Sequence, residues 1–296
     1  MNNQKRHARY RQSVYRQRKI KTVLITVICV LAALTIAFLA VGSILSGRTD
    51  GTTNVPNDPP STSGGIKKSD ITVNSRFVPL AEDGSTLGSR LSAATSAGYS
   101  DINFMLDTED GALYYQSEIA SLLGKQKNAA SDLRTLSNIV SLMSAQKLYC
   151  TAVTHVSEMR SNNDLVRSAA IGYHAALIAE VLRAGIDEVL VMPGDISEDR
   201  YDELTKLADE VHRLAESSKI GIVLPASVFT SDNSADIVHK FSQKFDFIAV
   251  RVDAETDMSG LIFYLLSYNV RVIVPDAETA ESIRAERGHQ NIQIMP

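Results

Sequence analysis

Carboxylates follow several short apolar runs in this 296-residue chain. One run ends in Asp107-Thr108-Glu109-Asp110-Gly111, and a later one ends in Arg251-Val252-Asp253. Hydrolysis of a glycosidic bond needs two carboxyl groups, because one protonates the leaving oxygen while the other activates water or attacks the sugar. The sequence therefore offers Asp107 or Glu109, paired with Asp253, as candidate catalytic residues.

Other polar side chains at equivalent places could bind a substrate. His155 and Arg251 are the cations of an otherwise acidic set, to which Asp195 adds a carboxylate. Tyr114 and Tyr115 follow the first acidic turn and offer flat rings, which suit sugars. Since neighbouring side chains of an extended segment point in opposite directions, we expect only one of these two tyrosines to face a ligand.

Several common chemistries lack support in the sequence. His155 and Glu158 lie three residues apart with no second histidine nearby, so we expect no metal site. Ser227 lacks the Gly-x-Ser-x-Gly setting of a nucleophile elbow. No Gly-rich dinucleotide loop follows any apolar run, and we expect no cofactor. Asp195 and Asp276 each precede a helical run, which also suits an N-cap.

After residue 70, short β-rich runs alternate with longer stretches of helical spacing. Runs such as IGIVL and VRVIV are apolar at nearly every position, as parallel strands covered on both faces are. We predict eight strands, at Thr72–Val78, Asp101–Asp107, Leu148–Thr154, Glu188–Met192, Ile220–Leu224, Phe247–Val252, Val270–Val274 and Asn291–Met295. We predict seven helices between them, near 86–97, 132–146, 165–184, 198–217, 234–243, 258–268 and 277–287.

This alternation predicts a small α/β fold, a (β/α)8 TIM-like barrel, whose functional residues would lie at the carboxyl ends of the strands. The alternative is an open, doubly wound sheet. The barrel is favoured because eight strands are predicted and no dinucleotide loop is present. Because the sequence stops at Pro296, directly after the eighth predicted strand, we expect the barrel to lack its eighth helix.

The first seventy residues differ from this domain in composition. Residues 1–21 hold eight Lys or Arg and no acid, 22–46 are uncharged and mostly apolar, and 47–70 are rich in Gly, Pro, Ser and Thr. Twenty-five helical residues span about 37 Å, enough to cross a bilayer. We predict a basic cytoplasmic tail, a single-pass transmembrane helix, a flexible linker and an extracytoplasmic domain over 71–296. Cleavage after the apolar segment is the alternative.

Charge and cysteine content narrow the range of partners. Residues 71–296 contain 19 basic and 31 acidic residues, so the predicted domain is acidic and we expect no nucleic-acid binding. Cys150 is the one cysteine of this region, which excludes a disulfide within it. The expected partners are the cell membrane, through the anchor, and either a glycan ligand or an envelope protein.

Two segments carry a resemblance to a known family. SAGYSDINFMLDTEDGALYYQS (96–117) and AGIDEVLVMP (184–193) resemble the second- and fourth-strand regions of a bacterial glycosyl hydrolase-like TIM-barrel domain family. Gly185, Asp187 and Glu188 agree with the pattern of that family. Met192 stands where the family has a strand-end Asp, and the Arg-Phe-Pro part of its signature is absent.

The resemblance implies that Asp107, Glu109, Asp110 and Gly111 belong to a site at the second strand. It also implies that the second carboxylate of the family is lost at Met192. We therefore consider two hypotheses. The first is a membrane-anchored, glycoside hydrolase-like barrel that acts on or recognises cell-envelope or extracellular glycans, whether catalytically active or degenerate. The second is a non-catalytic domain that binds an envelope protein or serves as a scaffold.

In the turn after the second predicted strand, we expect some residues to have a structural role and Asp107 to have a functional one. We expect Asp110-Gly111 to make the turn, since glycine supplies a positive φ without steric cost. We expect Asp107 to point into the barrel mouth, where other acids would surround it. A carboxylate surrounded by other acids is more often a cost to stability than a gain. We therefore expect Asp107→Asn to leave folding nearly unchanged.

Overall fold

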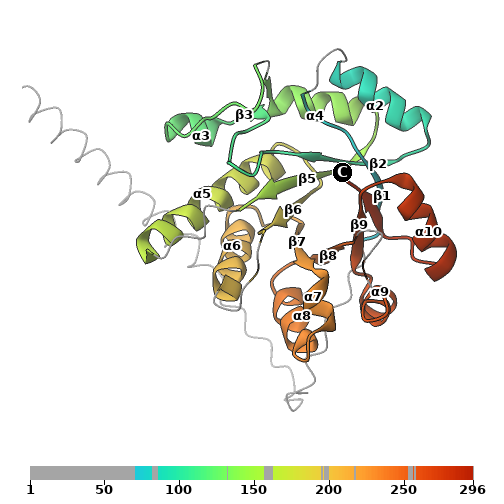
Figure 1. The fold of residues 1–296 in the computed structure, drawn as a ribbon. Coiled ribbons are helices and arrows are strands. Elements are labelled where there is room, and N and C mark those ends of the chain that lie inside the picture. The colour runs from blue at the N-terminus through green and yellow to red at the C-terminus, as the bar shows by residue number, and fades with distance from the viewer. Residues whose placement is uncertain are drawn as a thin grey trace, which may run out of the picture. The chain divides into compact units, whose positions relative to one another are not determined.

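Eight parallel strands close into a barrel (Figure 1). The structure, a computed structural model, describes residues 71–81, 86–131, 133–156, 163–194, 196, 200–216, 218–252, 256 and 258–295. Around the barrel the strands follow the order β1 (Asn74–Phe77), β10 (Ile292–Ile294), β9 (Arg271–Val274), β8 (Phe247–Arg251), β7 (Ile220–Pro225), β6 (Glu188–Met192), β5 (Tyr149–His155) and β2 (Asp101–Met105). The predicted barrel is confirmed and the open sheet is excluded. The predicted tail, transmembrane helix and linker lie outside the described residues.

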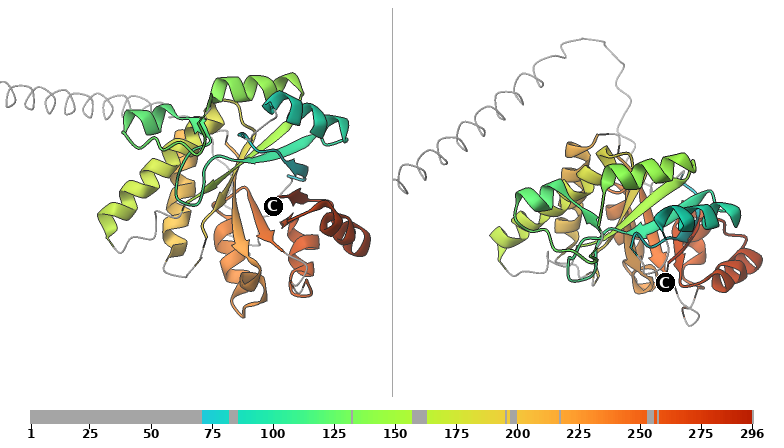
Figure 2. Two further views of the ribbon diagram at one scale, coloured as in Figure 1. Left: turned by 45° about the horizontal axis from the view of Figure 1, so that its top comes forward. Right: turned by 90° about the horizontal axis from the view of Figure 1, so that it is seen from above.

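Helices surround the strands on the outside of the barrel (Figure 2). They are α2 (Leu87–Ser96), α3 (Glu118–Leu122), α4 (Leu136–Ala145), α5 (Asp164–Arg183), α6 (Tyr201–Leu214), α7 (Ala226–Thr230), α8 (Ser234–Ser242), α9 (Ile262–Tyr268) and α10 (Ala277–Arg287). All seven predicted helices are present, while α3 and α7 were not predicted. No helix follows β10 in the described part of the chain.

Short polar side chains fix where several helices begin. Thr86, Thr135, Asn163 and Asp276 each accept a hydrogen bond from a backbone N–H in the first turn of the following helix. Such an N-cap satisfies one of the donors that the first turn leaves without a partner. The predicted cap at Asp276 is thus confirmed, and the hydrogen bond from Thr279 N–H lowers the pKa of this carboxyl.

The longest helix, α5, is apolar enough by length and composition to cross a membrane. It nevertheless packs along the barrel against α6, α3 and β6. Its buried side chains include Ala175, Leu177 and Ile178. This burial identifies α5 as an outer helix of the barrel.

The two faces of each strand have different neighbours. Outward side chains such as Ile102, Phe104 and Val189 pack against the helices in the main apolar core. Inward side chains form a second apolar cluster that includes Val153, Leu190 and Ile273 inside the barrel. Burial on both faces explains why the strands read as nearly continuous apolar runs.

A polar belt crosses the interior of the barrel. Its members are fully buried: Ser75, Asn103, Thr151, Glu188, Arg271 and Gln293. The Arg271 guanidinium on β9 forms an ion pair with Glu188 on β6, three strands away around the sheet. Thr151 donates to Glu188 Oε1 at 2.6 Å, and Tyr149 donates to Oε2 at 3.0 Å. These hydrogen bonds satisfy the Glu188 carboxylate and lower the cost of burying the pair, whereas Arg271 Nε and Nη2 have no hydrogen-bond partner among the described residues.

The belt extends to the remaining strands. Asn103 on β2 donates to Ser75 Oγ and to Ile294 O, both at 3.0 Å. The Phe247 ring on β8 lies 4.1 Å from the Arg271 guanidinium carbon, in a cation–π arrangement. On β7, Gly221 leaves the space that this ring fills, because a Cβ there would lie 2.2 Å from Phe247 Cε2.

A long insertion follows β2 and covers one side of the barrel. It contains α3 and a two-stranded parallel sheet of β3 (Tyr115–Gln116) and β4 (Arg134–Thr135). Glu180 on α5 anchors it, accepting from Ser117 Oγ at 2.7 Å and from Glu118 N at 2.6 Å. Beside this anchor, a groove of about 1150 Å³ runs between α3, α4 and α5, and Leu122 on its rim is 82% exposed.

Gly221→Ala tests whether the polar belt depends on the space at β7. The added methyl group must displace the Phe247 ring from the Arg271 guanidinium, so we expect a loss of roughly 1–3 kcal/mol in the free energy of unfolding. Urea titration followed by circular dichroism measures this loss. Gly172→Ala on α5 is the matched control, because nothing lies within 4 Å of its Cβ and alanine favours a helix. Equal stability of the two variants would contradict the prediction.

Candidate functional site

The Asp107 carboxylate is held by three donors at the end of β5. It accepts from Thr154 Oγ1 at 2.7 Å and from the His155 backbone N–H at 2.8 Å. The ring Nδ1 of His155 lies 3.0 Å from Asp107 Oδ1. Asp107 is only 3% exposed. Its carboxylate therefore joins β2 to β5 and is oriented by both residues.

The His155 ring takes a defined tautomer from this contact. An ionised carboxylate only accepts hydrogen bonds, so Nδ1 carries a proton and Nε2 is the nitrogen available for other contacts. Burial disfavours the charged ring, but the hydrogen bond and charge of Asp107, with the charge of Glu109, outweigh it. The pKa of His155 is consequently raised above its usual value.

The turn after β2 has the predicted geometry. Gly111 adopts a φ of 78°, and its N–H donates to Thr108 O at 2.9 Å. Thr108 Oγ1 donates to Asp110, and this hydrogen bond lowers the pKa of the Asp110 carboxyl. Glu109 is exposed in the same turn, close enough to His155 to influence its pKa. The prediction that Asp110-Gly111 makes the turn is confirmed.

The inner surface near the mouth is largely apolar. Phe77, Met105 and Met192 are partly buried and pack on the apolar cluster inside the barrel. Arg251, at the end of β8, is exposed and lies three strands around the barrel from His155. Among the described residues, therefore, the two predicted cations stand on opposite sides of the mouth.

The two tyrosines of the insertion belong to its packing. Tyr115 is fully buried, and its hydroxyl donates to Glu180 Oε2 at 3.3 Å. Tyr114 is partly buried against the main apolar core, and its N–H donates to Leu106 O at 2.8 Å. The structure does not place the Tyr115 ring at the mouth. Asp195 and Asp253 lie outside the described residues, so the predicted pairing of Asp107 or Glu109 with Asp253 stays a prediction.

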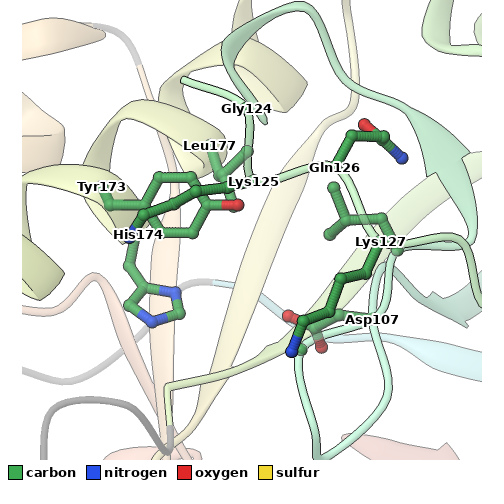
Figure 3. Close-up of a pocket in the computed structure, with 10 residues that line it drawn as sticks. Asp107, Gly124, Lys125, Gln126, Lys127, Tyr173, His174 and Leu177 are labelled. Atoms are coloured by element: carbon green, nitrogen blue, oxygen red, sulfur yellow. The ribbon is translucent and has the colours of Figure 1, made fainter. Parts of the chain in front are cut away.

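A pocket of about 270 Å³ opens beside Asp107, between the insertion and α5 (Figure 3). The insertion contributes Lys125, Gln126 and Lys127, and α5 contributes Tyr173, His174 and Leu177. Ligand pockets usually measure roughly 300–1,000 Å³, so this one suits a single-ring ligand. Lysine, glutamine and histidine side chains share this lining with the phenol ring of Tyr173.

The sequence does not reveal this pocket, because its residues come from elements that no motif connects. Lys125 and Lys127 lie in the insertion, and Tyr173 and His174 lie in the middle of α5. One signal was present: the segment between β2 and α4 is longer than the usual βα loop of two to six residues. Long loops at this end of a barrel commonly carry function.

No group of three or more His, Cys, Asp or Glu residues suitable for a metal ion occurs in the part of the chain that the structure describes. Cys150 is buried, and burial raises the pKa of its thiol to about 12. A thiol with so high a pKa is a poor nucleophile.

Comparison with solved structures supports the barrel fold. A dihydrodipicolinate synthase is similar over 76% of this chain and 70% of its own, with 14% identity and a TM-score of 0.50. A D-psicose 3-epimerase from Clostridium cellulolyticum H10 has 11% identity over 76% of this chain and 84% of its own, with a TM-score of 0.45. An α-L-fucosidase from Lactobacillus casei has 12% identity over 63% of this chain and 71% of its own, with a TM-score of 0.37.

The similarity to the synthase shows the TIM-barrel fold alone. No protein-family model and no curated protein matches the chain. The resemblance to a glycosyl hydrolase-like family is therefore confirmed at the level of the barrel fold, and the finer assignment stays a prediction.

Asp107→Asn tests the contact between β2 and β5. Three donors face a carboxylate, so the contacts argue against the expectation that this change leaves folding nearly unchanged. We expect a loss of roughly 1–3 kcal/mol in the free energy of unfolding and a lower pKa of His155, measured by urea titration and by NMR titration of the ring.

The loss should depend on pH in a defined direction. Since the pKa of His155 is raised by folding, protonation of the ring stabilises the folded state. This contribution is complete below about pH 6.5 and disappears as the pH rises through the folded pKa. Asp107→Asn should thus cost more at pH 5.5 than at pH 8.5. Asp164→Asn, at an exposed carboxylate on α5, is the control, and an equally small loss in both variants would contradict the prediction.

Proposed function

We propose that the chain is a membrane-anchored, extracytoplasmic barrel that recognises cell-envelope or extracellular glycans without hydrolysing them. The observation that carries this proposal is the state of Asp107, the strand-two carboxylate that a hydrolase would use. Its carboxylate accepts from Thr154 and from the His155 backbone, and lies against the His155 ring. A buried carboxylate with these partners is a positioning group rather than a nucleophile.

The end of β6, two strands around the barrel from β2, supports the same conclusion. Glycoside hydrolysis needs a second carboxyl group at roughly 5–10 Å from the first. At the end of β6, the place where the resembling family has an aspartate, the side chain is Met192. It packs with Phe77 and Met105 on the apolar cluster inside the barrel. An apolar side chain there supports binding over bond cleavage.

The pocket beside Asp107 suits recognition of a sugar ring. It is concave, it measures about 270 Å³, and its lining combines amide and ammonium donors with the ring of Tyr173. Sugars are bound by such a combination, because their hydroxyl groups need hydrogen bonds and their ring faces are apolar. The anchored location is proposed from the uncharged segment 22–46 and the basic residues before it.

A second candidate function is proton transfer by His155. The observation that favours it is the contact of Nδ1 with Asp107, which leaves Nε2 as the nitrogen that can exchange a proton. The pKa of the ring is raised above the usual histidine value, chiefly by the hydrogen bond and charge of Asp107, which favours the protonated form. In this case Asp107 orients the ring and His155 is the catalytic residue.

Retention on immobilised cell-wall and soluble polysaccharides tests the proposal, with the full-length chain purified in mild detergent. We expect retention without release of reducing ends, and Tyr173→Ala should weaken retention about tenfold because it removes the ring from the pocket. Tyr268→Ala on α9 is the control outside the pocket. Sustained release of reducing ends would contradict the proposal. Absence of any retention would favour the alternative, an envelope-protein-binding domain.

A further inference from the structure

Two ammonium groups reach the pocket from one short segment of the insertion. Lys125 and Lys127 both line it, together with His174 from α5 (Figure 3). The Lys125 ammonium lies 4.3 Å from the centre of the Tyr173 ring, in a cation–π contact that holds it against the wall of the pocket. The two lysines therefore line one small pocket, Lys125 on its Tyr173 side and Lys127 on its Asp107 side (Figure 3).

Hydrogen bonds hold the residue between the two lysines in place. Gln126 is tied into the insertion: its Nε2 donates to Tyr115 O at 3.1 Å, and its Oε1 accepts from Ser117 N at 3.1 Å. These hydrogen bonds fix the segment that carries both lysines at the edge of the pocket.

The charge of the pocket contrasts with that of its surroundings. Residues 71–296 hold 31 acidic and 19 basic residues. Yet neither Lys125 nor Lys127 forms an ion pair within the part of the chain that the structure describes. The one carboxylate in the lining is Asp107, which is occupied by Thr154 and His155. Asp110 lies near Lys127 in the exposed turn, without a contact at ion-pair distance.

We propose that this pocket is an anion subsite that binds the negatively charged substituent, a carboxylate or a phosphate, of a single-ring sugar through Lys125 and Lys127. Two ammonium groups beside an aromatic ring can satisfy one anionic group and the apolar face of the ring that carries it. The proposal deepens the function given above, since it rests on glycan recognition and makes the ligand an acidic saccharide.

Isothermal titration calorimetry with the full-length chain tests the subsite. The probes are glucuronate, glucose 6-phosphate and glucose, with acetate and inorganic phosphate as simple anions. We expect at least one acidic hexose to bind at least tenfold more tightly than glucose. The acidic sugar that binds more tightly identifies the preferred anionic group, which is a carboxylate for glucuronate and a phosphate for glucose 6-phosphate. Lys125→Gln combined with Lys127→Gln should raise its Kd at least tenfold, while Lys206→Gln, at an exposed position on α6, should leave its Kd unchanged.

The outcomes separate this inference from the proposed function. Equal affinity for glucose and the acidic hexoses, or an unchanged Kd in the double lysine variant, would overturn the subsite while leaving glycan recognition in place. Lysine-dependent binding of acetate or phosphate, without binding of any sugar, would support an anion site and overturn glycan recognition. Absence of binding by every probe would overturn the subsite.

Discussion

The ion pair between Arg271 and Glu188 organises the interior of the barrel. It joins β9 to β6 across the closed sheet, and side chains of β5, β8 and β10 complete its surroundings. Two buried charges are costly unless they are paired and hydrogen-bonded, so the neighbouring strands must keep their register for the pair to form. The polar belt therefore stabilises the observed strand register relative to a shifted register.

The filled interior leaves ligand binding to the carboxyl ends of the strands and to the insertion after β2. Carboxylates are paired with donors there too: the buried Asp107 accepts from donors of β5, and the half-buried Glu180 accepts from donors of the insertion. Both carboxylates are used for structure. The lysines on the pocket side of the insertion form no ion pair among the described residues, and they are the charges left to a ligand.

The sequence predicts the barrel well because each strand and helix has a strong local signal. Runs such as Glu188–Met192 were predicted with their observed bounds, and Asp276 was identified as a cap from its position alone. The site was less predictable because its contacts are long-range. Nothing near Asp107 in the chain reveals Thr154 as its donor, and nothing near Lys125 reveals Tyr173. Charged residues within apolar strands, Glu188 and Arg271, were the overlooked sign of an internal pair.

A double-mutant cycle on Glu188 and Arg271 tests the central claim most directly, with Glu188→Leu, Arg271→Met and the double variant compared by urea unfolding. Each single change leaves one buried charge without its partner, so each should lower the free energy of unfolding by about 3–5 kcal/mol. The double variant removes both charges. Its loss of stability should therefore be smaller than the sum of the two single losses by at least about 2 kcal/mol. Losses that add to within about 0.5 kcal/mol would contradict the account, because the two residues would then stabilise the barrel independently.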